Sequence, residues 1–216
     1  LPEVERTEAG VRTDRGVEVL GIPEQIRSFV AIELPDEAKG GLARLRRELE
    51  RDEHRFVKWV DPGGIHLTLK FLGNLSSRRV TEIADAMKKA AQGLSPFLLE
   101  ISGLGAFPSR KQPRVVWVGV GGELDKLSTL QQNIDSALAA LGFASEERPF
   151  VPHLTVARVR EGASASERGR FGELVASATF EGRYDIDAEA VRLMRSQLTP
   201  AGAIYTCLSV VGLGPQ

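Results

Sequence analysis

The chain has 216 residues, a formal net charge of −1, and 42% hydrophobic and 26% charged residues. This composition is typical of a globular protein, and the length suits one large domain or two small lobes around a substantial core. The charge excludes attraction of the whole molecule to nucleic acid or membranes, so a polyanion site would have to be a local basic patch. No apolar run approaches the length of a membrane span.

Cysteine occurs once, as Cys207, which excludes an internal disulfide and is typical of a reducing compartment. We therefore expect a cytoplasmic protein. The apolar run around Cys207, "IYTCLSVV", predicts a packed core residue rather than a nucleophile.

Residues 1–26 differ from the rest of the chain, because they are charged, hold few large apolar side chains and lack the apolar core of a signal peptide. We interpret them as an N-terminal extension with little order of its own. Residues 27–216 are expected to form a single bilobal domain.

Hydrophobic periodicity predicts alternating strands and helices from residue 28 onward. In the first half, strands are expected at 28–35, 56–60, 65–73 and 97–107, and amphipathic helices at 37–53, with Asp36 as N-cap, and at 76–94. In the second half, strands are expected at 114–120 and 153–159, helices at 123–143 and 164–178, and extended segments at 179–198 and 203–213. Both halves therefore repeat the same order, which indicates an internal duplication and two similar lobes related by a pseudo-two-fold axis.

Two of the three histidines, His66 and His153, begin the same pattern His-Leu-Thr-aliphatic, 87 residues apart. Side chains alternate along a strand, so His66, Thr68 and Lys70 should share one face, and His153 and Thr155 should share the corresponding face in the second half. A cleft between the lobes would then contain two imidazoles and two hydroxyl groups. The third histidine, His54, lies among charges and is expected to be solvated.

Paired imidazoles suit a reaction that needs a base and an acid together, because histidine titrates near neutral pH. In-line hydrolysis of a phosphodiester fits, with threonine hydroxyls donating to the phosphate oxygens. One such motif alone is more often structural, but two matched copies in a histidine-poor chain favour function. A metal site is less favoured, because the motifs supply only two histidines and no carboxylate or cysteine; we expect no cofactor.

The pattern resembles the two-histidine phosphoesterase superfamily, and within it the RNA 2′,3′-cyclic phosphodiesterases, also called 2′,5′ RNA ligases. The resemblance runs from about 27 to 212 and rests on "RSFVAIELP", "FVKWVDPGGIHLTLKFLGNL", "GLGAFPSRKQPRVVWVGV", "RPFVPHLTVARV" and "LMRSQLTPAGAIY". It implies a bilobal α+β fold with antiparallel sheets facing a central cleft and helices outside. It also implies that His66 is the general acid, that His153 is the general base, and that Thr68 and Thr155 bind the phosphate.

Further substrate-binding candidates are Arg158, Arg114 and Tyr205, which match recurring family positions, and Lys70 and Trp59, which could offer charge and stacking to an RNA end. Arg158 should lie on the face opposite His153 unless the strand bulges. Tyr205 is more simply read as a core aromatic, and each basic residue as a solvated charge. The chain departs from the family at Val151, where a basic residue is frequent, and at Ala203, where proline is frequent.

The expected partner is RNA, or a nucleotide, with a 2′,3′-cyclic phosphate end; no membrane and no obligate protein partner are indicated. Two other activities remain open: ligation of tRNA halves through a 2′,5′ bond, and hydrolysis of small cyclic nucleotides. A protein that binds RNA ends without turnover is the competing class, although a binder needs no titratable imidazole.

Overall fold

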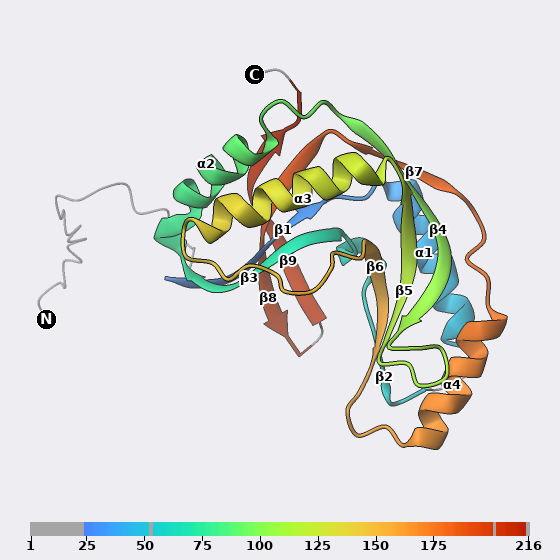
Figure 1. The fold of residues 1–216 in the computed structure, drawn as a ribbon. Coiled ribbons are helices and arrows are strands. Elements are labelled where there is room, and N and C mark those ends of the chain that lie inside the picture. Colours follow the sequence, from blue (N-terminus) through green and yellow to red (C-terminus); the bar gives the residue numbers. More distant parts are fainter. Residues whose placement is uncertain (1–23, 52–53, 201, 215–216) are drawn as a thin grey trace, which may run out of the picture.

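The structure is a computed structural model that describes residues 24–51, 54–200 and 202–214 (Figure 1). It has an α+β fold with two antiparallel sheets, which confirms the expected fold class. Sheet A has the strand order β3-β1-β8-β9, and sheet B has the order β2-β6-β5-β4-β7. The strands of sheet A are β1 (Gln25–Ile32), β3 (Leu67–Ser76), β8 (Ala190–Thr199) and β9 (Gly202–Gly212). Those of sheet B are β2 (Val57–Trp59), β4 (Phe97–Phe107), β5 (Val115–Gly122), β6 (His153–Val159) and β7 (Tyr184–Ala188).

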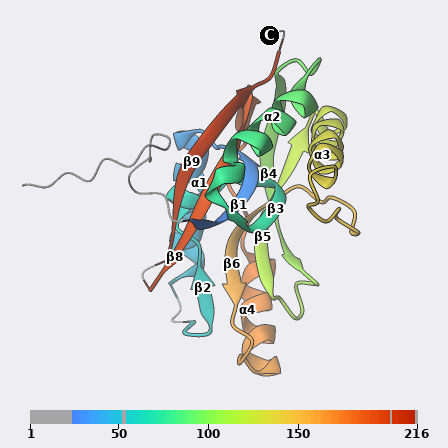
Figure 2. The same ribbon diagram turned by 90° about the vertical axis from the view of Figure 1, so that its left-hand side faces the viewer.

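Two pairs of helices cover the two sheets. The helices α2 (Val80–Ala91) and α3 (Leu124–Ala139) lie side by side and pack on sheet A, as both ribbon views show (Figures 1 and 2). The helices α1 (Asp36–Leu49) and α4 (Ala165–Ser177) pack on sheet B. Two short 3₁₀ helices, η1 (Pro62–Gly64) and η2 (Ser77–Arg79), lie in the connections. We call the helix-covered side of each sheet its outer face and the opposite side its inner face.

The helices form where the sequence places apolar side chains at helical spacing. The stripe on α3 is fully buried, with Leu127, Leu130, Ile134 and Leu138 all at 0% exposure. Gly41 lies within α1 although glycine is a weak helix former. Packing explains its presence, because a Cβ atom there would lie 2.6 Å from the ring of Tyr184. None of the helices in the described part of the chain is long and apolar enough to cross a membrane.

The sheets do not correspond to the two halves of the sequence. Strands β2 and β4 come from the first half but belong to sheet B, while β8 and β9 come from the second half and belong to sheet A. The two histidines nevertheless adjoin different sheets, because His66 immediately precedes β3 of sheet A and His153 is the first residue of β6 of sheet B. We call β3 and β6 the histidine strands. Each sheet therefore contains strands from both halves of the sequence.

The start of the domain differs from the expectation. Strand β1 begins at Gln25, and Ile26 is only 2% exposed, so the folded body begins before Arg27. The remainder of the expected extension, residues 1–23, lies outside the described residues. The helix α1 also begins differently: Asp36 is its first residue, and Pro35 occupies the N-cap position without a side-chain hydrogen bond.

Two predictions for single residues are wrong. Cys207 is exposed, because β9 is an edge strand that pairs only with β8. His54 is not solvated but half-buried, with ring centroids 5.4 Å from Phe56 and 5.1 Å from Phe171. Its Nε2 atom is buried and forms no hydrogen bond within the described residues.

Candidate active site

Both histidine motifs contain a β-bulge at their last, aliphatic position. In sheet A, Ala31 pairs with Thr68 and Val30 pairs with Lys70, so the intervening Leu69 has no partner on β1. In sheet B, Trp117 pairs with Thr155 and Val116 pairs with Ala157, so Val156 has no partner on β5. Each bulge lies three residues after its histidine, and each reverses the alternation of side chains beyond it.

In sheet B the bulge brings Arg158 to the inner face. The neighbours Ala157 and Val159 are buried, whereas Arg158 is exposed. Arg158 therefore lies on the same face of sheet B as His153. Its charge acts on the hydroxyl of Tyr205, which belongs to sheet A. The bulge needed to bring Arg158 to the face of His153 is therefore present.

In sheet A the bulge sends Lys70 to the outer face. Lys70 is 2% exposed, forms an ion pair with Asp135 of α3, and donates a hydrogen bond of 2.7 Å to the carbonyl of Ala144. Burial acts to raise the pKa of the Asp135 carboxyl, but hydrogen bonds from Lys70 and from the backbone N–H of Glu146 outweigh it and hold that pKa below its usual range. The placement of Lys70 beside His66 and Thr68 is wrong, and so is its candidate role in binding substrate.

Both imidazoles are held by the backbone in the same way. The Nδ1 atom of His153 lies 2.7 Å from the carbonyl oxygen of Val151, two residues earlier. The ring of His66 forms a hydrogen bond with the backbone of Gly64, again two residues earlier. A ring N–H fixed on a carbonyl leaves the other ring nitrogen free to exchange a proton.

His66 is enclosed by aromatic rings. It stacks on Phe29 with centroids 4.4 Å apart and an interplanar angle of 17°, and it meets Tyr205 edge-on at 4.9 Å. Gly64 allows this approach, because a Cβ atom there would lie 2.8 Å from the Tyr205 ring. Burial lowers the pKa of His66 to about 4, and the hydrogen bond with Gly64 opposes that shift only partly. Without substrate, His66 is neutral at pH 7.

His153 has a similar but looser aromatic surround. Phe107 meets its ring edge-on at 5.1 Å, and Trp117 lies 6.5 Å away. The Trp117 ring covers Gly105, where a Cβ atom would lie 2.4 Å from it. The indole Nε1 of Trp117 is buried without a hydrogen-bond partner among the described residues.

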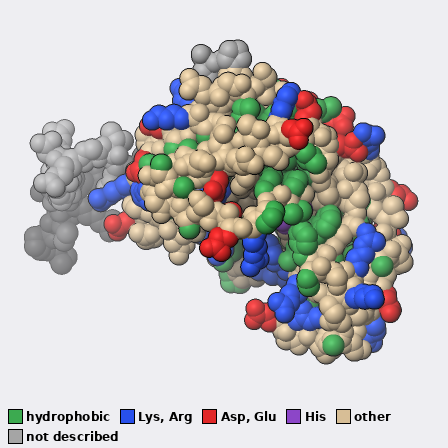
Figure 3. All heavy atoms as spheres, viewed as in Figure 1, with side chains coloured by type: hydrophobic (Ala, Val, Ile, Leu, Met, Phe, Trp, Pro, Cys, Tyr) green, Lys and Arg blue, Asp and Glu red, His purple; other side chains and the backbone are tan. Residues whose placement is uncertain are grey.

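The strands that carry the two motifs lie next to each other. The N–H of Val60 donates to the carbonyl of Val156 at 3.0 Å, and the chain then crosses through η1 to His66. Strands β3 and β6 are in contact, and Tyr205 lies within the electrostatic reach of both Arg158 and Arg27. Burial is the main reason that the pKa of Tyr205 is raised, and these two cations oppose the shift. Figure 3 shows histidine near the centre of this side of the molecule, between hydrophobic and basic side chains.

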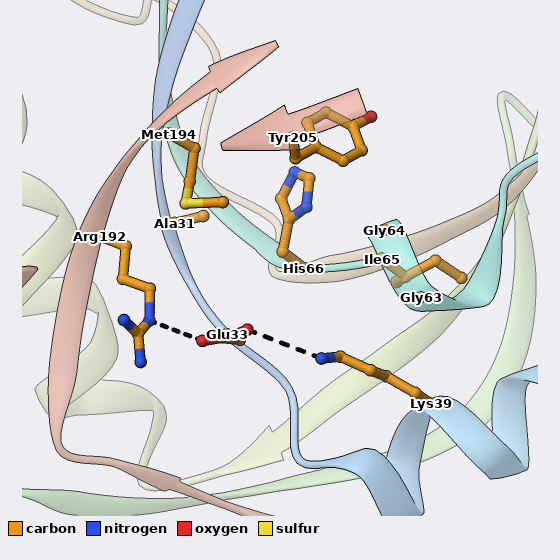
Figure 4. Close-up of a pocket in the computed structure, with 10 residues that line it drawn as sticks. All are labelled: Ala31, Glu33, Lys39, Gly63, Gly64, Ile65, His66, Arg192, Met194 and Tyr205. Carbon is orange, nitrogen blue, oxygen red and sulfur yellow. Dashed lines mark ion pairs between the residues drawn. The ribbon is translucent and has the colours of Figure 1, made fainter. Parts of the chain in front are cut away.

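A pocket of about 120 Å³ adjoins His66 (Figure 4). Tyr205 stands on one side of the imidazole, and Glu33 lies on the other, where it forms ion pairs with Arg192 at 2.8 Å and Lys39 at 3.7 Å. The pocket is lined by residues of β1, α1, η1, β8 and β9 and of the segments that follow β1 and η1: Ala31, Glu33, Lys39, Gly63, Gly64, Ile65, His66, Arg192, Met194 and Tyr205. Tyr205 thus lines the pocket next to His66 and is half-buried, rather than a fully buried core aromatic.

The remaining candidates are placed less centrally. Trp59 points to the outer face of sheet B and meets Phe171 of α4 edge-on at 6.0 Å, so its candidate stacking role is wrong. Its neighbour Lys58 takes the inner face instead. Arg114 is exposed at the start of β5, with its backbone bound to Phe107 and Val159. Thr68 and Thr155 are half-buried in their strands.

The sequence did not identify the aromatic residues that surround the histidines, namely Phe29, Phe107 and Trp117. Alternation along β1 and β5 shows on which face of its own strand Phe29 or Trp117 lies. Only the pairing with the neighbouring strands shows that these are the faces on which His66 and His153 lie. Across the described residues, no group of three or more His, Cys, Asp and Glu side chains could hold a metal ion.

Comparison with known proteins identifies a family and relatives of this chain. The model of the family "LigT like Phosphoesterase" matches twice, at residues 32–117 and 118–205, once for each repeat. The RNA 2′,3′-cyclic phosphodiesterase of Methanothermobacter thermautotrophicus is 34% identical over 189 residues, which is 88% of this chain and all of that protein.

Solved structures show the same fold. The crystal structure of TT0787 from Thermus thermophilus has a TM-score of 0.68 and 26% identity, and the match covers 87% of this chain and 98% of that one. E. coli LigT complexed with 3′-AMP has a TM-score of 0.71 and 23% identity, and the match covers 89% of this chain and all of that one. The chain belongs to the LigT-like phosphoesterase family.

Proposed function

We propose that this enzyme hydrolyses the 2′,3′-cyclic phosphate ends of RNA and leaves a 2′-phosphomonoester and a free 3′ hydroxyl. The observation that carries the proposal is the equivalent presentation of two imidazoles. Each imidazole forms a hydrogen bond with the backbone of the residue two positions earlier, and each lies three residues before a β-bulge. The two imidazoles adjoin different sheets, and the hydroxyl of Tyr205 lies near a cation from each of those sheets. A general acid and a general base on separate strands suit in-line displacement, which needs a group on each side of phosphorus.

The proton transfers follow from these positions. His153 removes a proton from water, and the water oxygen forms the new bond to phosphorus while the bond to the 3′ oxygen breaks. His66 supplies the proton that the departing 3′ oxygen takes up. The hydroxyls of Thr68 and Thr155 donate to the non-bridging oxygens, and the positive charge of Arg158 stabilises the negative charge on them.

The burial of His66 adds a requirement to this assignment. An acid with a pKa of about 4 is unprotonated at pH 7, so the bound substrate must raise that pKa. The anionic phosphate does so, because a negative charge close to an imidazole favours its protonated form. His66 would therefore become an acid only when the phosphate is in place.

The test is turnover of an oligonucleotide with a 2′,3′-cyclic phosphate end, followed by phosphorus NMR of the product. A 2′-phosphomonoester is expected. A 3′-phosphomonoester would mean that the substrate binds in the reverse orientation and that the acid and base roles are exchanged. Tight binding without any turnover would instead identify a non-catalytic RNA-end binder.

A further inference from the structure

Two cations lie directly opposite each other on the inner face of sheet B. Lys58 of β2 pairs across the strands with Arg158 of β6, and both side chains are exposed. Like charges at directly opposed positions of an antiparallel pair repel each other and destabilise the sheet. The ion pairs formed among the described residues include neither of them. This arrangement is explained if an anion lies over the pair.

A third cation approaches from sheet A. Arg27 lies on β1 two residues before Phe29, the ring on which His66 stacks, so alternation directs it to the same inner face. Arg27 and Arg158 both act on the Tyr205 hydroxyl, although they belong to different sheets. Arg27, like Lys58 and Arg158, has no carboxylate partner among the described residues.

The other side of His66 has the opposite character. There the carboxylate of Glu33 lies between Arg192 and Lys39 and neutralises one of their two charges (Figure 4). Glu33 lies six residues along the chain from Arg27, just beyond the end of β1, so the two sides of the site are well separated. An anionic chain leaving the site is attracted to the side with three unpaired cations and not to the side that holds a carboxylate.

With Arg158 assigned to the reacting phosphate, we propose that Arg27 and Lys58 extend this cationic surface into a binding site for the phosphodiester backbone on the 5′ side of the nucleotide that carries the cyclic phosphate. The site would make the enzyme selective for RNA ends over free cyclic mononucleotides. This inference rests on the proposed function and extends it from the reacting phosphate to the rest of the strand. The chain as a whole carries a net charge of −1, so attraction to the strand has to come from such a local group.

The experiment compares kcat/KM for a 2′,3′-cyclic mononucleotide, for the dinucleotide and trinucleotide that end in it, and for a trinucleotide with two uncharged methylphosphonate linkages. We expect kcat/KM to rise about tenfold with the charged upstream linkages and to return to the mononucleotide value with the uncharged ones. Lys58→Gln should lower the trinucleotide-to-mononucleotide ratio about threefold to fivefold, as for loss of an exposed charge contact. It should also make the plot of log kcat/KM against log salt concentration for the trinucleotide less steep by about 0.7, the value for one phosphate contact with a single strand.

Two variants serve as controls. Lys58→Arg should keep most of the ratio, since the charge is retained. Lys88→Gln, an exposed lysine of α2 on the outer side of sheet A, should leave the ratio as it is in the unmodified enzyme.

Equal kcat/KM for every length would overturn the inference while the proposed function stood. A length preference that survives both Lys58→Gln and the methylphosphonate linkages would overturn it as well, because the preference would then come from the sugars or bases. Failure to turn over any cyclic phosphate would overturn the proposed function together with it.

Discussion

The two histidine strands, β3 and β6, share a framework but differ in their surroundings. Both hold the imidazole through a backbone carbonyl two residues earlier, and both bulge three residues later. Yet His66 is closed in by Phe29 and Tyr205 and has a pKa lowered to about 4, whereas His153 is covered less closely. Backbone geometry thus repeats between the lobes, while the side chains around it make the two histidines chemically different.

Residues beyond the bulges separate the lobes further. Four residues after each histidine stand Lys70, buried in an ion pair, and Ala157, buried in the core. Five residues after stand Phe71, 59% exposed, and Arg158. One side of the cleft therefore offers an exposed ring and the other a cation. A duplicated fold acquires a direction for its substrate through such positions.

The largest effect is expected from removing the imidazoles, which are the feature that the two lobes share. His66→Ala or His153→Ala should each lower kcat/KM by about 10²–10⁴, the range for general acid–base catalysis. The double variant should lose less than the product of the two losses, because the groups act as a unit. Steady-state kinetics on a cyclic-phosphate oligonucleotide measures all three. Near-full activity of either single variant would remove that histidine from the mechanism.

The next prediction tests the Lys70 position, which has no charged counterpart in the second lobe. Lys70→Ala should reduce the free energy of unfolding by about 3–5 kcal/mol, because it leaves Asp135 with a partly buried, unpaired charge. Urea denaturation measures the change. Combining it with Asp135→Ala should recover part of the loss, since neither charge then remains. If the Lys70→Ala protein had normal stability but had lost activity, Lys70 would have to be assigned to substrate binding after all.

The difference in burial between the histidines predicts the pH dependence. If His66 is the acid, kcat/KM should fall as pH rises through about 4, because the free enzyme loses that proton there. The corresponding limb of kcat should lie at higher pH, since the bound phosphate raises the pKa of His66. If kcat/KM instead rises through pH 4, His66 is the base and the two roles are exchanged.

Stability must be followed in the same pH range as a control. The unfolded chain binds the His66 proton near pH 6.5 and the folded chain near pH 4, so folding stability falls as pH decreases between these values. The loss from this group reaches about 3 kcal/mol, and circular dichroism at each pH shows whether the enzyme is still folded.

The smallest expected effect is that of chelation. Exhaustive treatment with EDTA should leave kcat/KM within about twofold of its initial value, because the paired motifs offer fewer ligands than metal sites normally use. Turnover that is lost and then restored by one divalent ion would require a metal in the mechanism.

The sequence by itself determined the motifs, the repeat and most of the elements of this protein. His66 and His153 stand out because histidine is rare and its context recurs, and the buried stripe of α3 follows from helical periodicity. These features depend on residues close together in the chain, where chemistry and spacing can be read directly.

Only the tertiary structure decided which side chains face the cleft. The bulge at Leu69 places Lys70 on the face opposite His66, and the bulge at Val156 places Arg158 on the face of His153. Neither bulge is visible without the partner strands. The placement of β8 and β9 in sheet A brought Tyr205 to His66 and formed the pocket beside it. Burial of His66, and hence its pKa, depends on rings far apart in the sequence, because desolvation is a property of the packed surroundings and not of the motif.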